Sequence, residues 1–197
     1  MKINLNEIYA QLKAWRHERG ITAESQKEGY IINIMEEFGE LASALREYER
    51  FSKPSYPYPK NKKYAEHGII DALCDISVFT INAGTDVNCN EKIEVINTTQ
   101  TTRCNSSLSF LLSECGNFDY YGKLSSYVCF NQILLSCAKL CEQYGFNFEI
   151  AMLETIKEIS SRTGVYDENA KKWVKDESDE AKAKWYKADY EKARIEQ

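Results

Sequence analysis

The feature that most constrains this chain is the run HGIIDALCDISVFTINAG, residues 67–84, which is apolar on nearly every side when it is wound into a helix. A helix of this kind is stable in water only when other elements cover most of its surface. It therefore predicts an all-α fold, a helical bundle in which 67–84 is buried on most sides. Two charged residues, Asp71 and Asp75, interrupt the run four positions apart and share one face of the helix.

An acid-rich helix precedes this run. Apolar residues recur at spacings of three and four through INIMEEFGELASAL, and they predict a helix from near Ser25 or Gln26 to around Arg50. The same helix carries three carboxylates close together, Glu36, Glu37 and Glu40. Carboxylates three and four positions apart repel each other by a few tenths of a kcal/mol per pair, so something should compensate for them.

The rest of the chain divides around these two helices. Further helices are predicted by the same periodicity over residues 5–20, 126–145 and 147–164. The three prolines all lie in KPSYPYPK, residues 53–60, which predicts a loop. We expect one domain over 1–164, with an Asn- and Thr-rich insertion at about 85–124, and a charged C-terminal extension over 165–197 that packs on the core. The first part of the insertion could hold a short strand at KIEVI or be irregular. A short helix is expected at SLSFLLSEC.

Composition excludes several classes of function. The net charge is -5, from 25 basic and 30 acidic residues, which argues against a nucleic-acid partner because phosphate backbones are bound by concentrated Lys and Arg. The apolar runs are too short for a membrane span, and the N-terminus has no signal-peptide pattern, so we expect a cytoplasmic protein. The seven cysteines form no CxxC pair and only two histidines exist, so a zinc site is poorly supported. Cys137 and Cys141 are expected to be buried as small hydrophobic residues.

The acidic residues point to a hard cation. The short loop between the two helices makes them antiparallel neighbours, so Glu37 and Glu40 would face Asp71 and Asp75. Four carboxylates in one bundle would repel each other strongly unless divalent cations offset their charge. Oxygen ligands favour Mg²⁺ or Mn²⁺, and Mg²⁺ commonly takes further ligands from substrate phosphates. The alternative is that the acids lie on a solvated face and pair with Lys or Arg.

Two motifs resemble a known family. EEFGELASAL followed by IIDALCDISVFTIN resembles the all-α nucleoside triphosphate pyrophosphatases, the group that contains MazG, dimeric dUTPases and phosphoribosyl-ATP pyrophosphohydrolase. Their pattern is ExxE on one helix and an acidic pair, commonly ExxD, on the next. AWRHERGI also looks like the helix before ExxE in MazG-type chains, and ETIKEISSRTG with KKWVKD resembles a phage and bacterial MazG-like branch. The resemblance covers residues 5–84, and the family's later helices correspond to 125–164.

The resemblance implies roles for the acids. It makes Glu37, Glu40, Asp71 and Asp75 catalytic metal ligands, with Glu36 as an extra acid that could bind a second ion or accept a proton from water. The family's first acid of ExxD is replaced by Ala72, so either Asp71 or Glu66 would supply the third ligand. The implied reaction is Mg²⁺-dependent hydrolysis of a nucleoside triphosphate, deoxy or ribo, to the monophosphate and pyrophosphate, which sanitises or rebalances the nucleotide pool.

The resemblance also implies substrate contacts. Basic residues after the last core helix are expected to contact phosphate, and Asn82 matches a position where related chains often have Asn: the basic residues are Lys157, Arg162, Lys172 and Lys175. Trp15 or Phe38 could stack on a base, although both types of residue are more often core. The family implies a homodimer or homotetramer. A non-catalytic MazG-like protein that binds a nucleotide or metal is the alternative, and a helical interaction module without metal affinity is a third possibility.

Overall fold

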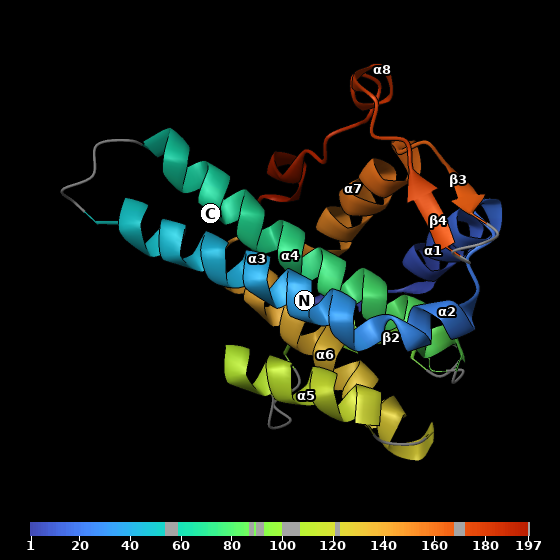
Figure 1. The fold of residues 1–197 in the computed structure, drawn as a ribbon. Helices are drawn as coiled ribbons and strands as arrows, with labels where there is room; N and C mark the ends of the chain where they lie inside the picture. The colour runs from blue at the N-terminus through green and yellow to red at the C-terminus, as the bar shows by residue number, and fades with distance from the viewer. Residues whose placement is uncertain are drawn as a thin grey trace.

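The computed structural model describes residues 1–53, 59–86, 89, 93–99, 107–120, 123–167 and 172–196, and these residues are mostly helical (Figure 1). In chain order the elements are β1 (Lys2–Asn4), α1 (Asn6–Glu18), α2 (Ala23–Glu28), α3 (Tyr30–Phe51), α4 (Pro59–Asp86), β2 (Val95–Asn97), α5 (Leu108–Tyr120), α6 (Lys123–Gln143), α7 (Phe148–Ser161), β3 (Gly164–Asp167), β4 (Lys172–Lys175), α8 (Asp179–Lys182) and the 3-10 helix η2 (Tyr190–Ala193).

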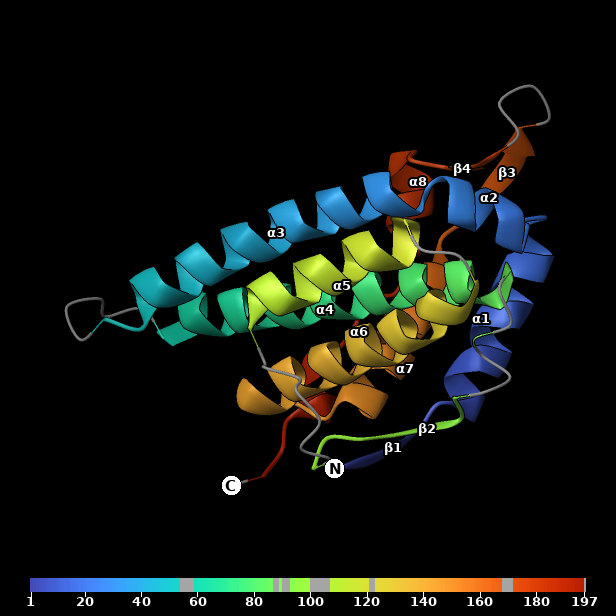
Figure 2. The same cartoon turned by 90° about the horizontal axis from the view of Figure 1, so that it is seen from below.

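The long helix α4 is the axis of the bundle. It runs antiparallel to α3 along most of its length, and α2, α6 and α7 pack on its other sides (Figures 1 and 2). Its apolar side chains Ile69, Leu73 and Ile76 are fully buried. The prediction of an all-α bundle around residues 67–84 is therefore confirmed.

The helix predicted from Ser25 or Gln26 to Arg50 is two helices. The short helix α2 begins after Thr22, whose side chain accepts a hydrogen bond from the Ser25 backbone N–H and caps the helix. Gly29 separates α2 from α3. The stretch predicted as a proline loop is shorter than expected, because α4 already begins at Pro59, a residue suited to the first helical position. Residues 54–58 of that stretch lie outside the described part of the chain.

The segment predicted as an insertion, 85–124, contributes to the core where it is described. The strand expected at KIEVI is present as β2, which pairs antiparallel with β1, so that Ile3 lies opposite Ile96. The helix α5 is longer than the expected SLSFLLSEC and packs on α6 and α3 (Figure 2). Leu111, Cys115 and Phe118 of α5 are fully buried in the same hydrophobic cluster as α4.

The C-terminal extension 165–197 packs on the core and contains strands as well as helix and loop. It begins with a hairpin of β3 and β4, in which Tyr166 lies opposite Trp173. Its last part is fixed to the start of α7: the Asn147 N–H donates to the Ala193 carbonyl at 2.6 Å, and the Ile195 N–H donates to the Gly145 carbonyl at 2.8 Å. Gly145 has φ +83°, a left-handed conformation that ends α6 and favours glycine.

Two further predictions concern cysteines and membranes. Cys137 and Cys141 are fully buried, as expected, and the other described cysteines are buried and free as well. Among the described helices, none is both long and apolar enough to cross a membrane.

Close packing at Gly84 gives a test of the fold. A Cβ at this position of α4 would lie 2.4 Å from Cε2 of Phe130, a fully buried ring of α6. We expect Gly84→Ala to lower the free energy of unfolding by about 1–3 kcal/mol, because the overpacked ring must move. Gly39→Ala on α3, where nothing lies within 4 Å, should instead raise it by up to ~1 kcal/mol through helix propensity. Urea unfolding of both variants measures this, and equal effects would contradict the packing at Gly84.

Candidate functional site

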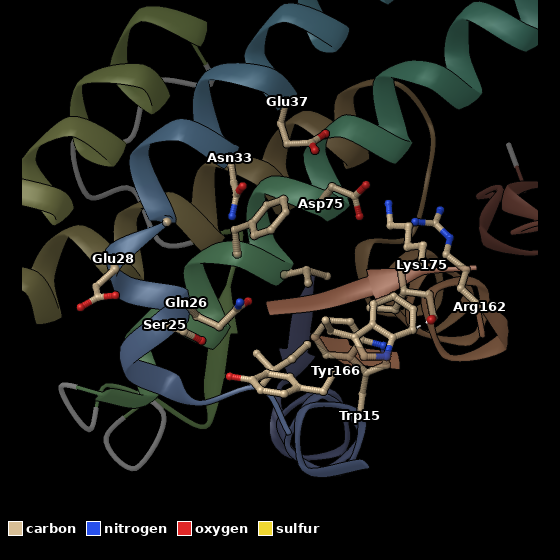
Figure 3. A pocket seen from close by; sticks show the side chains of 16 residues that line it. Trp15, Ser25, Gln26, Glu28, Asn33, Glu37, Asp75, Arg162, Tyr166 and Lys175 are labelled. Atoms are coloured by element: carbon tan, nitrogen blue, oxygen red, sulfur yellow. Dashed lines mark hydrogen bonds between the residues drawn. The ribbon is translucent and has the colours of Figure 1, made fainter. Parts of the chain in front are cut away.

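A cavity of about 690 Å³ lies where α1, α2, α3, α4, the C-terminal end of α7 and the β3–β4 hairpin meet (Figure 3). Side chains of different chemistry line it: Trp15, Ile21, Ser25, Gln26, Glu28, Gly29, Asn33, Glu37, Asp75, Val78, Phe79, Ile159, Arg162, Tyr166, Trp173 and Lys175. Five residues that the sequence singled out are therefore brought to one cavity: Trp15, Glu37, Asp75, Arg162 and Lys175.

One end of the cavity is acidic. Burial, and then repulsion from Glu40, Asp71 and Glu36, raises the pKa of Glu37 to about 7. Its Oε2 atom is buried and has no hydrogen-bond partner in the described structure. Burial also raises the pKa of Asp75, and the charges of Asp71 and Glu37 add to this effect. The predicted carboxylates are thus close enough to destabilise each other's charged forms.

Asp71 belongs to this acidic cluster, and Glu66 does not. Burial raises the pKa of Asp71 although Tyr190 of η2 donates a hydrogen bond to its Oδ1 at 2.5 Å. Glu66 accepts a hydrogen bond from Arg194 at 2.9 Å and lines a different surface hollow. Of the two alternatives for the third acidic ligand, the structure therefore brings only Asp71 near the others.

One carboxylate of this cluster, Glu158, was not predicted from the sequence. Glu158 of α7 raises the pKa of both Asp71 and Asp75 through its charge. Its Oε1 accepts from Arg162 at 2.8 Å, and its Oε2 accepts from the Ala188 N–H at 2.8 Å. The i, i+4 spacing of Glu158 and Arg162 was the available signal for this pair.

Of the remaining predicted residues, those whose side chains the structure describes lie outside the cavity lining. Glu36 and Glu40 are exposed on α3, next to Glu37. Lys157 is also exposed, and its ammonium lies 3.9 Å from the ring centroid of Tyr186. Asn82 is fully buried and does not line the cavity. The side chain of Lys172 lies outside the described part of the chain, and Phe38 is partly buried against the core, which leaves Trp15 as the predicted aromatic residue that lines the cavity.

The other end of the cavity is aromatic. Trp15 and Tyr166 lie at the end away from Glu37 (Figure 3), and Phe79 and Trp173 also line the cavity. The Arg19 guanidinium lies 5.3 Å from the Trp15 ring centroid and 5.1 Å from that of Trp173, so it joins α1 to the hairpin by cation–π contacts. Residues of the hairpin had no place in the sequence-based site apart from the two lysines of β4, because strand pairing was not predicted there.

The side chains of Gln26 and Asn33 also line the cavity and make few protein contacts. Gln26 accepts one hydrogen bond, from Asn82 Nδ2 at 3.4 Å. Within the described structure, Asn33 has no side-chain hydrogen bond. Both amides are therefore available to a ligand in the cavity.

Metal ligation is not preformed at the acidic end. Among the described residues, no group of three or more His, Cys, Asp or Glu side chains is arranged so that it could hold a metal ion. The unpartnered Glu37 oxygen and the mutually raised carboxylate pKa values nevertheless fit a cation of the kind that oxygen ligands prefer. The donor chemistry fits Mg²⁺, and the ligand set stays a prediction.

Comparisons with known proteins give no further guide. No family model, no curated protein and no solved structure matches this chain. The function is therefore inferred from the fold and from the residues of this cavity.

The pKa of Glu37 predicts how stability depends on pH. Because the folded chain keeps this proton up to about pH 7 and the unfolded chain loses it near 4.5, stability falls as pH rises between these values. We expect Glu37→Gln to unfold at higher urea concentration than the wild type at pH 8 and at nearly the same concentration at pH 4.5, both in EDTA. The control is Glu47→Gln, the same change at an exposed position of α3. A Glu37→Gln variant less stable than the wild type at pH 8 would contradict the carboxylate repulsion.

Proposed function

We propose that this protein is a Mg²⁺-dependent nucleoside triphosphate pyrophosphatase that converts a (d)NTP to the (d)NMP and pyrophosphate, in order to sanitise or rebalance a nucleotide pool. The observation that carries the proposal is that one cavity has Glu37 at one end and Trp15 and Tyr166 at the other, with two basic side chains and two amides also in its lining (Figure 3). A nucleotide has the matching division, with a cation-bound triphosphate at one end and a base at the other.

The acidic end would hold the ion. Glu37 and Asp75 line the cavity, and Asp71 and Glu40 lie near enough to raise the pKa of Glu37. When bound, Mg²⁺ would neutralise charge on phosphate oxygens and supply a metal-bound water as nucleophile. The role of the chain's own carboxylates would be to fix the position of the ion, and Glu36 would remain available to accept a proton.

The basic side chains would hold the phosphates. Arg162 and Lys175 line the cavity beside Asp75 (Figure 3). A guanidinium can donate two hydrogen bonds to one phosphate, whereas an ammonium acts as a compact charge. Glu158 orients Arg162 by accepting from Nη2, and the buried Nε of Arg162 has no partner in the described structure. Asn82, Lys157 and Lys172 are not supported as direct contacts by what the structure describes of them.

One observation favours the alternative function, a non-catalytic MazG-like protein that binds a nucleotide or a metal. The described carboxylates form no ready group of three ligands, and Asp71 is already hydrogen-bonded to Tyr190. In such a protein the cavity would still take a nucleotide, but no bond would be cleaved. The family's homodimer or homotetramer also stays a prediction.

The catalytic proposal is tested by pyrophosphate release from a panel of dNTPs and NTPs with Mg²⁺. We expect release that depends on the metal, and a loss of at least about 10-fold in Glu40→Gln, because removing a ligand or its neighbour weakens the ion's position. Glu47→Gln keeps the same helix and loses the same charge outside the cluster, so it should retain the wild-type rate. Equal rates in both variants would show that Glu40 has no role in the site. If no substrate releases pyrophosphate, the proposal that the protein is an enzyme is wrong.

Metal binding is tested separately from catalysis by thermal unfolding. Mg²⁺ or Mn²⁺ should raise the Tm at pH 8, since an ion at 100 times its Kd adds about 2.7 kcal/mol to stability. EDTA should reverse the shift, and Asp75→Asn should abolish it. If the ion shifts the Tm and nothing is hydrolysed, the binding protein is favoured. If the Tm does not respond to the ion, the helical interaction module without metal affinity is favoured.

A further inference from the structure

A buried arginine sets the orientation of an amide beside the cavity. Arg16 of α1 donates through Nη1 to Asn82 Oδ1 at 2.9 Å, to the Asn82 carbonyl at 3.3 Å and to Thr85 Oγ1 at 3.0 Å. A guanidinium has only donors, so the side-chain atom of Asn82 that faces Arg16 must be its oxygen. The Nδ2 atom of Asn82 is thereby turned away from Arg16.

The orientation of the Asn82 amide in turn determines the orientation of the Gln26 amide. Asn82 Nδ2 donates to Gln26 Oε1 at 3.4 Å. The reverse orientation of Gln26 would bring two NH₂ groups together, and neither group can accept a hydrogen bond. The Oε1 atom of Gln26 therefore faces Asn82, whereas its Nε2 atom has no hydrogen-bond partner among the described residues. Because Gln26 lines the cavity, it offers a ligand a donor (Figure 3).

This arrangement is costly to the fold. Arg16 is only 7% exposed, and its three acceptors are all neutral. A buried cation without a carboxylate partner costs desolvation free energy that an apolar side chain would not. Burial accordingly lowers the pKa of Arg16. Packing alone does not account for an arginine here, whereas the orientation of Asn82 and Gln26 does.

The surroundings of Gln26 suit a flat heterocycle. Trp15, Phe79 and Trp173 line the same cavity, and aromatic rings of this kind stack on nucleobases without discriminating among them. Asn33 makes no side-chain hydrogen bond in the described structure, so its amide can turn to present either a donor or an acceptor. Discrimination between bases therefore falls to Gln26, whose orientation is fixed.

We propose that the aromatic end of the cavity selects a nucleobase with a carbonyl oxygen at the edge facing Gln26 Nε2, where uracil has O4 and guanine or hypoxanthine has O6. Bases with an amino group at that edge, cytosine and adenine, place a donor against a donor and are rejected. Leaving buried polar groups unpaired is an effective basis for such selectivity. The inference deepens the proposed function, on which it rests, by naming the class of base.

The first test measures binding of mononucleotides by titration calorimetry, which requires no hydrolysis. Two pairs differ at the relevant edge: dUMP against dCMP, and dIMP against dAMP. We expect the Kd of the carbonyl member of each pair to be at least about 10-fold lower, a ratio that corresponds to the loss of one hydrogen bond. Equal affinities, tighter binding of dCMP and dAMP, or no binding of any of the four overturns the inference.

The second test reverses the orientation of the Gln26 amide by a substitution at Asn82, which does not line the cavity. In Asn82→Asp one carboxylate oxygen still accepts from Arg16, and the other would face Gln26. Gln26 must then donate through Nε2 and turn Oε1 into the cavity, so the preference should invert in favour of dCMP and dAMP. A residue with a merely structural role would not invert a preference. A folded variant with the wild-type preference overturns the inference.

A matched pair covers the case in which Asn82→Asp does not fold. Gln26→Glu keeps an acceptor for Asn82 Nδ2 and places a second acceptor in the cavity, so it should also favour dCMP and dAMP. Gln143→Glu makes the same change at an exposed position that lines a different hollow, and it should keep the wild-type preference. If Gln26→Glu behaves like Gln143→Glu, the inference fails.

The failure of this inference differs from the failure of the proposed function. If pyrophosphate is released but the paired nucleotides bind equally well, the pyrophosphatase proposal is supported and the proposed role of Gln26 is wrong. Discrimination between the mononucleotides without any release supports the base site and removes the catalytic proposal.

Discussion

The structure depends on one constraint, which is the burial of residues 67–84 of α4, a stretch that carries two aspartates and has almost no polar face. The apolar side chains of this stretch require apolar neighbours, and Asp71 and Asp75 require that some neighbours be polar. The acids of α3 approach from one side, whereas Arg162 and Tyr190 approach from the other. The polar residues that gather around α4 are thus a consequence of where its two charges lie.

The C-terminal extension meets part of this requirement through polar contacts. Glu154 of α7 is buried, and it accepts hydrogen bonds from the Tyr186 hydroxyl, from the Asp189 N–H at 3.0 Å and from Lys192 at 3.0 Å. These contacts place η2 so that Tyr190 reaches Asp71. A strongly charged segment can therefore support the core, since Lys192 pairs with the buried Glu154 of α7, and Tyr190 and Ala193 are buried.

The elements that could be predicted from the sequence are those with a clear local periodicity of apolar residues. The helices of the bundle and the convergence of Glu37 with Asp75 follow from apolar spacing and from two acidic motifs on helices joined by a short loop. The pairing of Lys2–Asn4 with Val95–Asn97 could not be predicted, because strands of three residues carry little periodic signal and their partners are far apart in the chain. Trp173 enters the cavity wall through the same kind of unpredicted pairing, with Tyr166.

Asn82 shows that a residue marked by a sequence motif need not contact the substrate itself. The resemblance marks this position for the substrate, yet the side chain is fully buried between Arg16 and Gln26. Hydrogen bonds have direction, so a donor-only guanidinium can determine which end of a second amide faces a ligand without touching that ligand. At the acidic end of the cavity, the residues marked by the sequence motifs include ones that would contact the substrate. At the aromatic end, a marked residue such as Asn82 instead orients a residue that lines the cavity. A sequence motif does not distinguish these two roles, whereas the fold does.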